Sequence, residues 1–266
     1  MKNFLIKYLF KYHLFRIYIY HPALFLFNFI RYRKLSFKIL KTIYKNDCFY
    51  NLYGFKVNSP SKIDKYFFAN INTHFNCFAL SNYELSEKYL IEKYLDKTDK
   101  ILELGGCLGV ISLITNSILN IKSNHIVLEI DELKFKYLKL NKHVNEAKFH
   151  IINGAISDNN KMYYMPSSNF WGGQITDSVK NTKSINTYNI NEIEDEFQIK
   201  FNTLIMDIEG GEIEIFEKQD LKYIKKIIFE NHYTNDKDQN TKIAKILKGF
   251  GYKSIETNGK VEVWIK

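Results

Sequence analysis

The stretch Ile101-Leu102-Glu103-Leu104-Gly105-Gly106-Cys107-Leu108-Gly109-Val110 decides the fold that this sequence predicts. It begins as a short apolar run, passes through a glycine-rich turn and enters a helical pattern at 110–120. A strand, a glycine loop and a helix in this order are typical of the first unit of a doubly wound nucleotide-binding sheet. Glycines let the backbone adopt positive φ and approach a ligand, and the helix start offers N–H groups. The spacing E-x-G-x-x-x-G alone is equally compatible with an ordinary turn.

A second short strand is expected at 125–131, about 20 residues after the glycine loop, and it holds Glu129 near its end. This is where a Rossmann-like fold places the acid that binds the ribose hydroxyls of a nucleotide. The alternative is an acid that only caps the following helix.

The rest of the chain alternates between strand and helix patterns. Strands are expected at 149–152, 203–206, 225–229 and 261–265, helices at 81–95, 133–143 and 242–248, a hairpin at 49–58, and strand-like pieces at 161–166 and 185–190. The helix at 81–95 would open with a capping box from Ser81 to Glu84. The pattern predicts an α/β fold with a Rossmann-like, doubly wound, mostly parallel sheet and ligand at the strand C-termini.

Net charge is concentrated at the start of the chain. The formal net charge is +9, and residues 1–50 carry ten basic side chains against one acidic side chain, Asp47. The remaining residues are balanced, so the predicted Rossmann-like domain lacks a basic, nucleic-acid-like surface. The three cysteines are widely spaced and indicate neither a disulfide framework nor a zinc site.

Residues 1–48 are interpreted as a basic, aromatic-rich N-terminal extension, and residues 49–266 as the Rossmann-like domain. The longest uncharged run of the extension, 17–30, would reach roughly 21 Å as a helix, short of the ~30 Å hydrocarbon core. Residues 1–45 therefore favour either a segment lying on an anionic membrane surface or a helical extension packed on its own domain or on a partner subunit.

Several ordered motifs resemble the FkbM-like methyltransferase family. The clearest is Leu204-Ile205-Met206-Asp207-Ile208-Glu209-Gly210-Gly211-Glu212, which resembles the family's fourth-strand motif. The others are the glycine loop at 103–109, Leu128-Glu129, the segments 153–158 and 186–190, and Glu230-Asn231-His232. The chain departs from the family pattern at four positions, which are Glu103, Gly106, Cys107 and Met206.

The resemblance implies S-adenosylmethionine as the cofactor. It implies that Gly105, Gly106 and Gly109 approach the methionine part, and that Glu103 positions the loop and the cofactor's amino group. Glu129 would accept hydrogen bonds from the ribose, and Ala155 and Ile156 would flank the adenine.

Methyl transfer to oxygen also needs a base, and the candidates are Asp207, Glu209 and His232. Each has a structural alternative: the two acids can cap the next helix, and the histidine can be purely structural. Glu212 is expected on a helix surface. Asp207, Glu209 and Glu212 could hold a divalent metal as an oxygen-rich cluster, but the spacing does not require it and no metal is predicted.

The leading hypothesis is an S-adenosylmethionine-dependent O-methyltransferase that acts on a hydroxyl of a glycan or another small hydroxylated acceptor. The expected location is the cytoplasm, with the extension touching a membrane face. One alternative is an RNA methyltransferase with a basic arm, although the neutral domain argues against nucleic acid. Another is a non-catalytic, membrane-peripheral protein with a degenerate cofactor fold. The acceptor and the oligomeric state are not encoded in these patterns.

Overall fold

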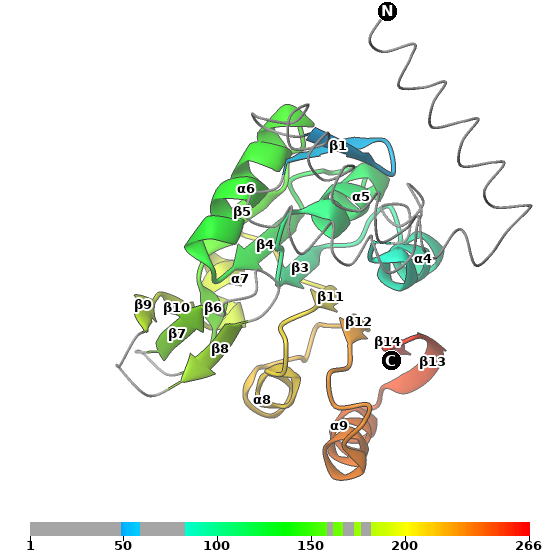
Figure 1. The fold of residues 1–266 in the computed structure, drawn as a ribbon. Helices are drawn as coiled ribbons and strands as arrows, with labels where there is room; N and C mark the ends of the chain where they lie inside the picture. The colour runs from blue at the N-terminus through cyan, green and yellow to red at the C-terminus, as the bar shows by residue number, and fades with distance from the viewer. Residues whose placement is uncertain (1–48, 59–82, 159–161, 167–172, 177–181) are drawn as a thin grey trace, which may run out of the picture. The chain divides into compact units, whose positions relative to one another are not determined.

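A seven-stranded sheet forms the centre of the molecule (Figure 1). Its strand order is β13-β14-β12-β11-β3-β4-β5. The strands are β3 (Ile101–Leu104), β4 (His125–Glu129), β5 (His150–Asn153), β11 (Thr203–Met206), β12 (Lys226–Glu230), β13 (Lys253–Asn258) and β14 (Val261–Ile265). The five strands from β5 to β12 are parallel, whereas β14 runs antiparallel to both of its neighbours. The predicted Rossmann-like, mostly parallel fold is confirmed.

The computed structural model describes residues 49–58, 83–158, 162–166, 173–176 and 182–266, all of which belong to the unit Phe49–Lys266. The predictions for residues 1–48, for Ser81 and for most of the loop at 167–174 lie outside the described residues. The division at residue 48 therefore stays a prediction.

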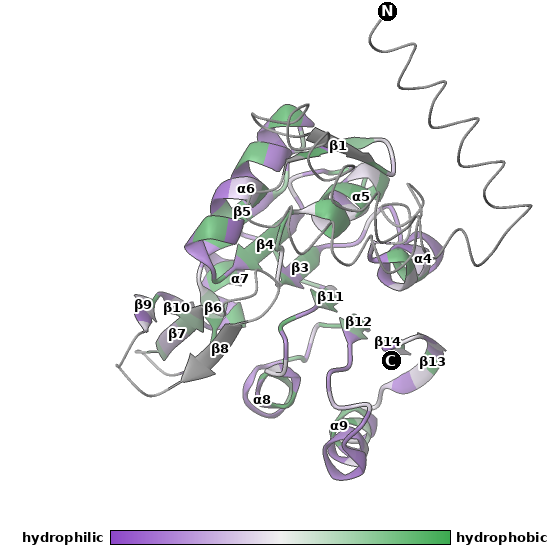
Figure 2. Cartoon of the chain, in the orientation of Figure 1, coloured by the Kyte–Doolittle hydropathy of each residue, from purple (hydrophilic) through white to green (hydrophobic). Residues whose placement is uncertain are grey.

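Helices cover both faces of the sheet. One face carries α4 (Leu85–Tyr94), α5 (Val110–Ile118) and α6 (Glu132–Val144), and the other carries α7 (Ile190–Phe197), α8 (Glu212–Lys218) and α9 (Lys237–Gly249). Successive residues of a strand point to opposite faces. Along β4, Val127 packs with α4–α6, while Ile126 and Leu128 pack with α7–α9. The central strands β3 and β4 are accordingly mostly hydrophobic (Figure 2), with Glu103 in β3 and His125 and Glu129 at the two ends of β4 as the polar residues.

The chain reverses its direction of winding between β3 and β11. From β3 it proceeds outward through β4 to β5, and it then returns to place β11 on the other side of β3. Register pairs Leu104 with Leu128 on one side and with Met206 on the other. The residues that follow these strands therefore meet at one edge, which is where doubly wound sheets bind ligands.

Smaller elements surround this sheet. The predicted hairpin is present as β1 (Phe49–Leu52) and β2 (Phe55–Asn58), and the side chain of Asn145 bonds both the N–H and the C=O of Lys56. Two further small sheets contain β6 (Ala155–Ile156) with β10 (Thr187–Tyr188), and β7 (Met162–Pro166) with β8 (Gly173–Thr176) and β9 (Lys183–Ile185).

Two predicted elements differ from the structure. The helix expected from residue 81 begins at Leu85, because Glu84 occupies the N-cap in a left-handed conformation with φ 52° and its side chain makes no cap bond. The strand-like piece at 185–190 contains the end of β9 and all of β10, but its last residue, Ile190, begins α7, where Asn189 and Glu192 form a capping box. Local hydrogen bonding by Asn189 thus overrides the β pattern there.

Candidate active site

A cavity of about 730 Å³ lies at the C-terminal edge of the parallel strands. Its size is ordinary for a small-molecule site. Six residues predicted from the sequence line it, namely Gly105, Glu129, Ala155, Ile156, Asp207 and Glu209. The fold therefore gathers residues that are up to 104 positions apart in the chain into one site.

Gly105 allows the glycine loop to pack against the end of β11. Its φ is +90°, and a Cβ atom there would lie 1.8 Å from the carbonyl oxygen of Asp207. The N–H groups of Gly105 and Gly106 both donate to the carbonyl of Leu128, and that of Cys107 donates to Glu129. These three N–H groups already have protein acceptors, so this part of the loop offers a ligand close backbone approach more than hydrogen-bond donors.

Glu129 joins the loop to the end of β4. Its two carboxylate oxygens accept hydrogen bonds from the N–H groups of Cys107 and Asp131, each at 2.7 Å. Burial raises the pKa of Glu129, while the nearby Lys134 ammonium opposes the shift. The carboxylate lines the cavity and keeps lone pairs for a ligand, since each oxygen can accept more than one hydrogen bond.

Glu103 does not line the cavity. It precedes Leu104 on β3, and its side chain therefore points to the face covered by α5. There it is buried, accepts a hydrogen bond from the hydroxyl of Ser112 and lies 2.8 Å from Nε2 of His125. These contacts hold α5 in place just behind the glycine loop, and a role toward the cofactor's amino group stays a prediction.

Gly106 and Gly109 also lie behind the cavity wall. A Cβ atom on Gly106 would meet Val127 at 2.5 Å and Leu138 at 3.0 Å, and one on Gly109 would meet Leu138 at 2.7 Å. Both glycines thus make room for the Leu138 side chain of α6. The structure shows this packing role, and the direct approach of the two glycines to the cofactor stays a prediction.

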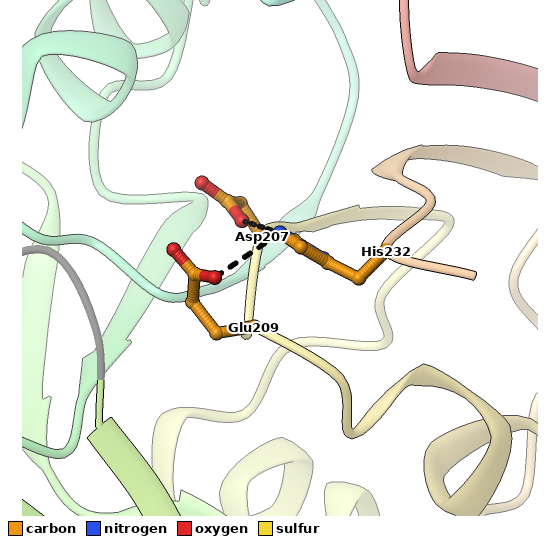
Figure 3. Close-up of side chains that lie close together, drawn as sticks. All are labelled: Asp207, Glu209 and His232. Carbon is orange, nitrogen blue, oxygen red and sulfur yellow. Dashed lines mark ion pairs between the residues drawn. The ribbon is translucent and has the colours of Figure 1, made fainter. Parts of the chain in front are cut away.

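His232 faces two of the predicted acids across the ends of β11 and β12 (Figure 3). Its Nε2 lies 3.6 Å from Oδ1 of Asp207 and 3.4 Å from Oε2 of Glu209. Glu209 has φ +57°, a left-handed conformation that costs a non-glycine residue free energy and is found at functional turns. The three candidate catalytic side chains are therefore neighbours.

Glu212 is the largest departure from the sequence-based expectation at this site. It was expected on the surface of α8, but its side chain is 0 % exposed and its Oε1 lies 2.6 Å from Nδ1 of His232. A sequence signal existed, because Glu212 precedes Ile215 and Phe216 by three and four positions and shares their buried helix face.

The cluster has unusual proton affinities. Burial, with the added charges of Glu230 and Glu209, raises the pKa of Asp207 to about 7. Burial alone would lower the pKa of His232, but the hydrogen bond and charge of Glu212 outweigh it and raise the pKa to about 9. Shifted pKa values such as those of Asp207 and His232 are typical of functional sites.

Glu84 and Tyr83 at the start of α4 also line the cavity, whereas the sequence patterns placed them only in a helix-capping segment. Oε2 of Glu84 is buried and has no hydrogen-bond partner among the described residues. Burial is the main cause that raises the pKa of Glu84 to about 8. Of the described residues, five acids and two lysines line the cavity, so it favours a positively charged ligand.

A sequence profile of the methyltransferase FkbM domain matches residues 69–254. The chain belongs to this family. The cofactor of this FkbM-domain protein is S-adenosylmethionine, as the resemblance implied, and the enzyme is a methyltransferase. Comparison with curated proteins gives no match.

Solved structures with a similar fold share little sequence with the chain. An O-methyltransferase from Bacillus cereus in complex with SAH has 11 % identity and a TM-score of 0.43, covering 87 % of this chain and 97 % of that one. A methyltransferase from Pyrococcus furiosus has 14 % identity and a TM-score of 0.44, covering 88 % and 95 %. Precorrin-6y C5,15-methyltransferase from Geobacter metallireducens has 12 % identity and a TM-score of 0.43, covering 68 % and 88 %. At these values the likeness carries no conclusion about substrate.

The residues around the cavity fit S-adenosylmethionine. Its sulfonium and ammonium groups are cationic, and five acidic side chains are among the described residues of the lining. Oε2 of Glu84 and Oδ1 of Asp207 lack a hydrogen-bond partner among the described residues, and a bound cation would favour the ionised forms of both groups. Gly105 leaves no side chain between the loop backbone and Asp207. Among the described helices of the FkbM-domain protein, each is too short or too polar to cross a membrane.

Proposed function

We propose that this protein is an O-methyltransferase that transfers a methyl group to a hydroxyl of a glycan or another small hydroxylated molecule. One observation carries the proposal: Asp207, Glu209 and His232 gather at the open strand ends, and the two acids line the same cavity as Glu129. O-methylation requires an acid–base group beside the cofactor to take the hydroxyl proton. A protein that only binds the cofactor does not need such a group.

On the cofactor side, Glu129 is proposed to accept hydrogen bonds from the ribose hydroxyls. Ala155 and Ile156, on β6 beside the end of β5, would flank the adenine, and Gly105 would face the methionine part. S-adenosylmethionine supplies an electrophilic methyl group on a sulfonium of charge +1. The carboxylates of the lining stabilise that charge, because opposite charges attract strongly inside a partly buried cavity.

On the acceptor side, Asp207, Glu209 and His232 are proposed to orient the hydroxyl and to handle its proton. Methylation forms a C–O bond as the C–S bond breaks, leaves the electron pair on sulfur and releases one proton from the hydroxyl. Orientation of the oxygen behind the methyl group contributes most of such a reaction's acceleration. A cluster of three side chains at one edge provides fixed contacts for that purpose.

A small neutral hydroxylated acceptor fits the lining better than RNA. The described cavity residues contain more carboxylates than amines, and a polyphosphate backbone would be repelled there. A cytoplasmic location and a membrane contact through residues 1–45 stay predictions. Flotation of full-length and truncated protein with anionic liposomes tests the membrane contact.

Cofactor binding is tested by calorimetry with S-adenosylhomocysteine on the wild type and on Glu129→Gln. We expect at least about a tenfold weaker affinity, since the variant loses a charge and sets its amide NH2 against the N–H group of either Cys107 or Asp131. Glu132→Gln is the matched control, because Glu132 lies nearby on α6 with a 59 % exposed side chain. It should bind like the wild type.

Methyl transfer is tested by a mass screen of hydroxylated acceptors for one added methyl group. Acid hydrolysis of the product distinguishes a methyl ether, which survives, from a methyl ester. Wild-type affinity in Glu129→Gln would refute the cofactor assignment, and methylation only of nitrogen, sulfur or carbon would refute the O-methyltransferase assignment.

A further inference from the structure

The cluster at the ends of β11 and β12 has the spacing of a cation site. Donor atoms of Asp207, Glu209 and His232 all lie within 4.8 Å of one another. The two distances from Nε2 of His232, 3.6 Å and 3.4 Å, exceed the usual 2.7–3.2 Å of hydrogen bonds. They match the roughly 3.3–3.6 Å that separates two ligands of a tetrahedral ion with bonds of about 2.0–2.2 Å.

An independent observation comes from the carboxylate behind the histidine. The side chain of Glu212 is 0 % exposed, and its 2.6 Å contact with Nδ1 holds the ring so that Nε2 faces Asp207 and Glu209 (Figure 3). Metal-binding histidines commonly have such a carboxylate on their other nitrogen. Oε2 of Glu212 and Oδ1 of Asp207 are both buried without a hydrogen-bond partner among the described residues. A bound cation would stabilise such buried carboxylate oxygens, which otherwise lack a partner for their lone pairs.

We infer that Asp207, Glu209 and His232 bind one divalent transition-metal ion, with Glu212 as the positioning residue behind the histidine. Two carboxylates and one imidazole suit Mn²⁺, Fe²⁺ or Zn²⁺ better than Ca²⁺ or Mg²⁺, which prefer oxygen ligands alone. Asp207 and Glu209 both line the cavity, so the remaining coordination positions face it. Three protein ligands with an open position are typical of catalytic and not structural metal sites.

This metal site differs from the one considered from the sequence. There, the set was Asp207, Glu209 and Glu212, and no metal was predicted. In the structure Glu212 contacts Nδ1 of His232, and the group of donor atoms close enough to share an ion consists of Asp207, Glu209 and His232. The exchange adds a nitrogen ligand, which changes the expected metal from an alkaline-earth ion to a transition-metal ion.

The use of the ion rests on the proposed function. Its open position would take the oxygen of the acceptor hydroxyl, and coordination lowers the pKa of a bound hydroxyl as it does for water. With the ion bound, Asp207, Glu209 and His232 would act as its ligands and not as bases, and the hydroxyl proton would leave to solvent before the C–O bond forms. The site thereby selects acceptors whose reacting oxygen can reach the metal.

Manganese is the probe for the test. Full-length protein, stripped with a chelator and free of cofactor and acceptor, is titrated with Mn²⁺, and free Mn²⁺ is read by electron paramagnetic resonance. We expect one saturable site per chain. Pulsed measurements on the bound ion should show coupling to a histidine ¹⁴N nucleus, and His232→Gln should abolish that coupling.

Three variants and one control define the site. Asp207→Asn, His232→Gln and Glu212→Gln should each raise the dissociation constant of Mn²⁺ by about tenfold or more. Glu217→Gln, on the same helix as Glu212 but exposed and paired with Lys242, should change it less than about twofold. Thermal melts verify folding, and Glu209→Gln replaces any variant that does not fold, because its side chain is 47 % exposed.

The inference fails if no saturable site is found, which would leave the cluster as a set of ion pairs. It also fails if Mn²⁺ binds with unchanged affinity in Asp207→Asn and His232→Gln, or without nitrogen coupling in the wild type. Because this measurement contains neither cofactor nor acceptor, its failure does not affect the methyl-transfer proposal. Failure of the acceptor screen, in turn, does not affect the metal site.

Discussion

Replacement of Gly105 by alanine separates close packing from backbone strain. Gly105 and Gly251 have nearly the same φ, +90° and +88°, so alanine strains the backbone similarly at both positions. A Cβ atom on Gly251 meets nothing within 4 Å, whereas one on Gly105 would lie 1.8 Å from the carbonyl oxygen of Asp207. Real Cβ atoms essentially never come within 3.0 Å of such an atom, so the loop and β11 must separate by about 1.2 Å.

The magnitudes follow from these two effects. The positive φ alone should cost Gly251→Ala about 1–2 kcal/mol of unfolding free energy. Gly105→Ala should lose about 2–5 kcal/mol, because overpacking against backbone adds about 1–3 kcal/mol. The forced separation also disturbs the hydrogen bond from the N–H of Asp207 to the carbonyl of Leu104.

Urea denaturation followed by circular dichroism measures both variants, and calorimetry measures their affinity for S-adenosylhomocysteine. We expect Gly105→Ala to bind more weakly, since Gly105 and Asp207 both line the cavity, and Gly251→Ala to bind normally. Equal stability losses in the two variants would refute the close packing of the loop on β11. Gly54→Ala, with φ +91° and open space, serves as a second control.

Three further predictions concern buried or strained charges. Asp99→Ala should destabilise the protein by about 2 kcal/mol in urea denaturation, because it removes the 2.7 Å partner of the 9 % exposed Lys226 and leaves Asp96, a 74 % exposed side chain at 3.0 Å, to pair with it. Asp195→Ala, at an 80 % exposed position, should stay within about 0.5 kcal/mol, and equal losses would contradict this reasoning. Burial raises the pKa of Glu84 to about 8, above its unfolded value. The folded state therefore binds this proton more tightly, and stability falls as pH rises from about 5 to 8. Glu84→Gln should then be more stable than the wild type at pH 9 but not at pH 5 in thermal melts with chelator, and a gain that is independent of pH would contradict the assignment. Glu209→Gly should relieve the strain of φ +57° and stabilise the fold by up to about 1 kcal/mol while Mn²⁺ binding falls. A clear loss of stability in urea would instead indicate that the carboxylate holds the turn.

Much of the fold could be predicted from local patterns. The strand at 203–206 was located at its observed bounds, and the glycine loop, the second strand and the hairpin were placed within a few residues. Apolar runs and glycine turns are local patterns, so they can be recognised in a short stretch of sequence without knowledge of the rest of the chain. The start of α4 at Leu85 and the start of α7 were missed because they depend on the conformations of single residues, Glu84 and Asn189.

The sequence alone determined which residues follow the strands, and so it identified Glu129, Asp207, Glu209 and His232 as neighbours at one edge. In a parallel sheet the residues that follow the strands lie at the same edge, however the helices pack on its faces.

Only the tertiary structure decided which way each side chain faces. The alternation of β3 turns Glu103 away from the cavity, and the shape of Leu138 gives Gly106 and Gly109 a packing role. The burial of α8 brings Glu212 behind His232. These outcomes depend on contacts between segments far apart in the chain, and such contacts form only when the sheet and its two helical layers close together.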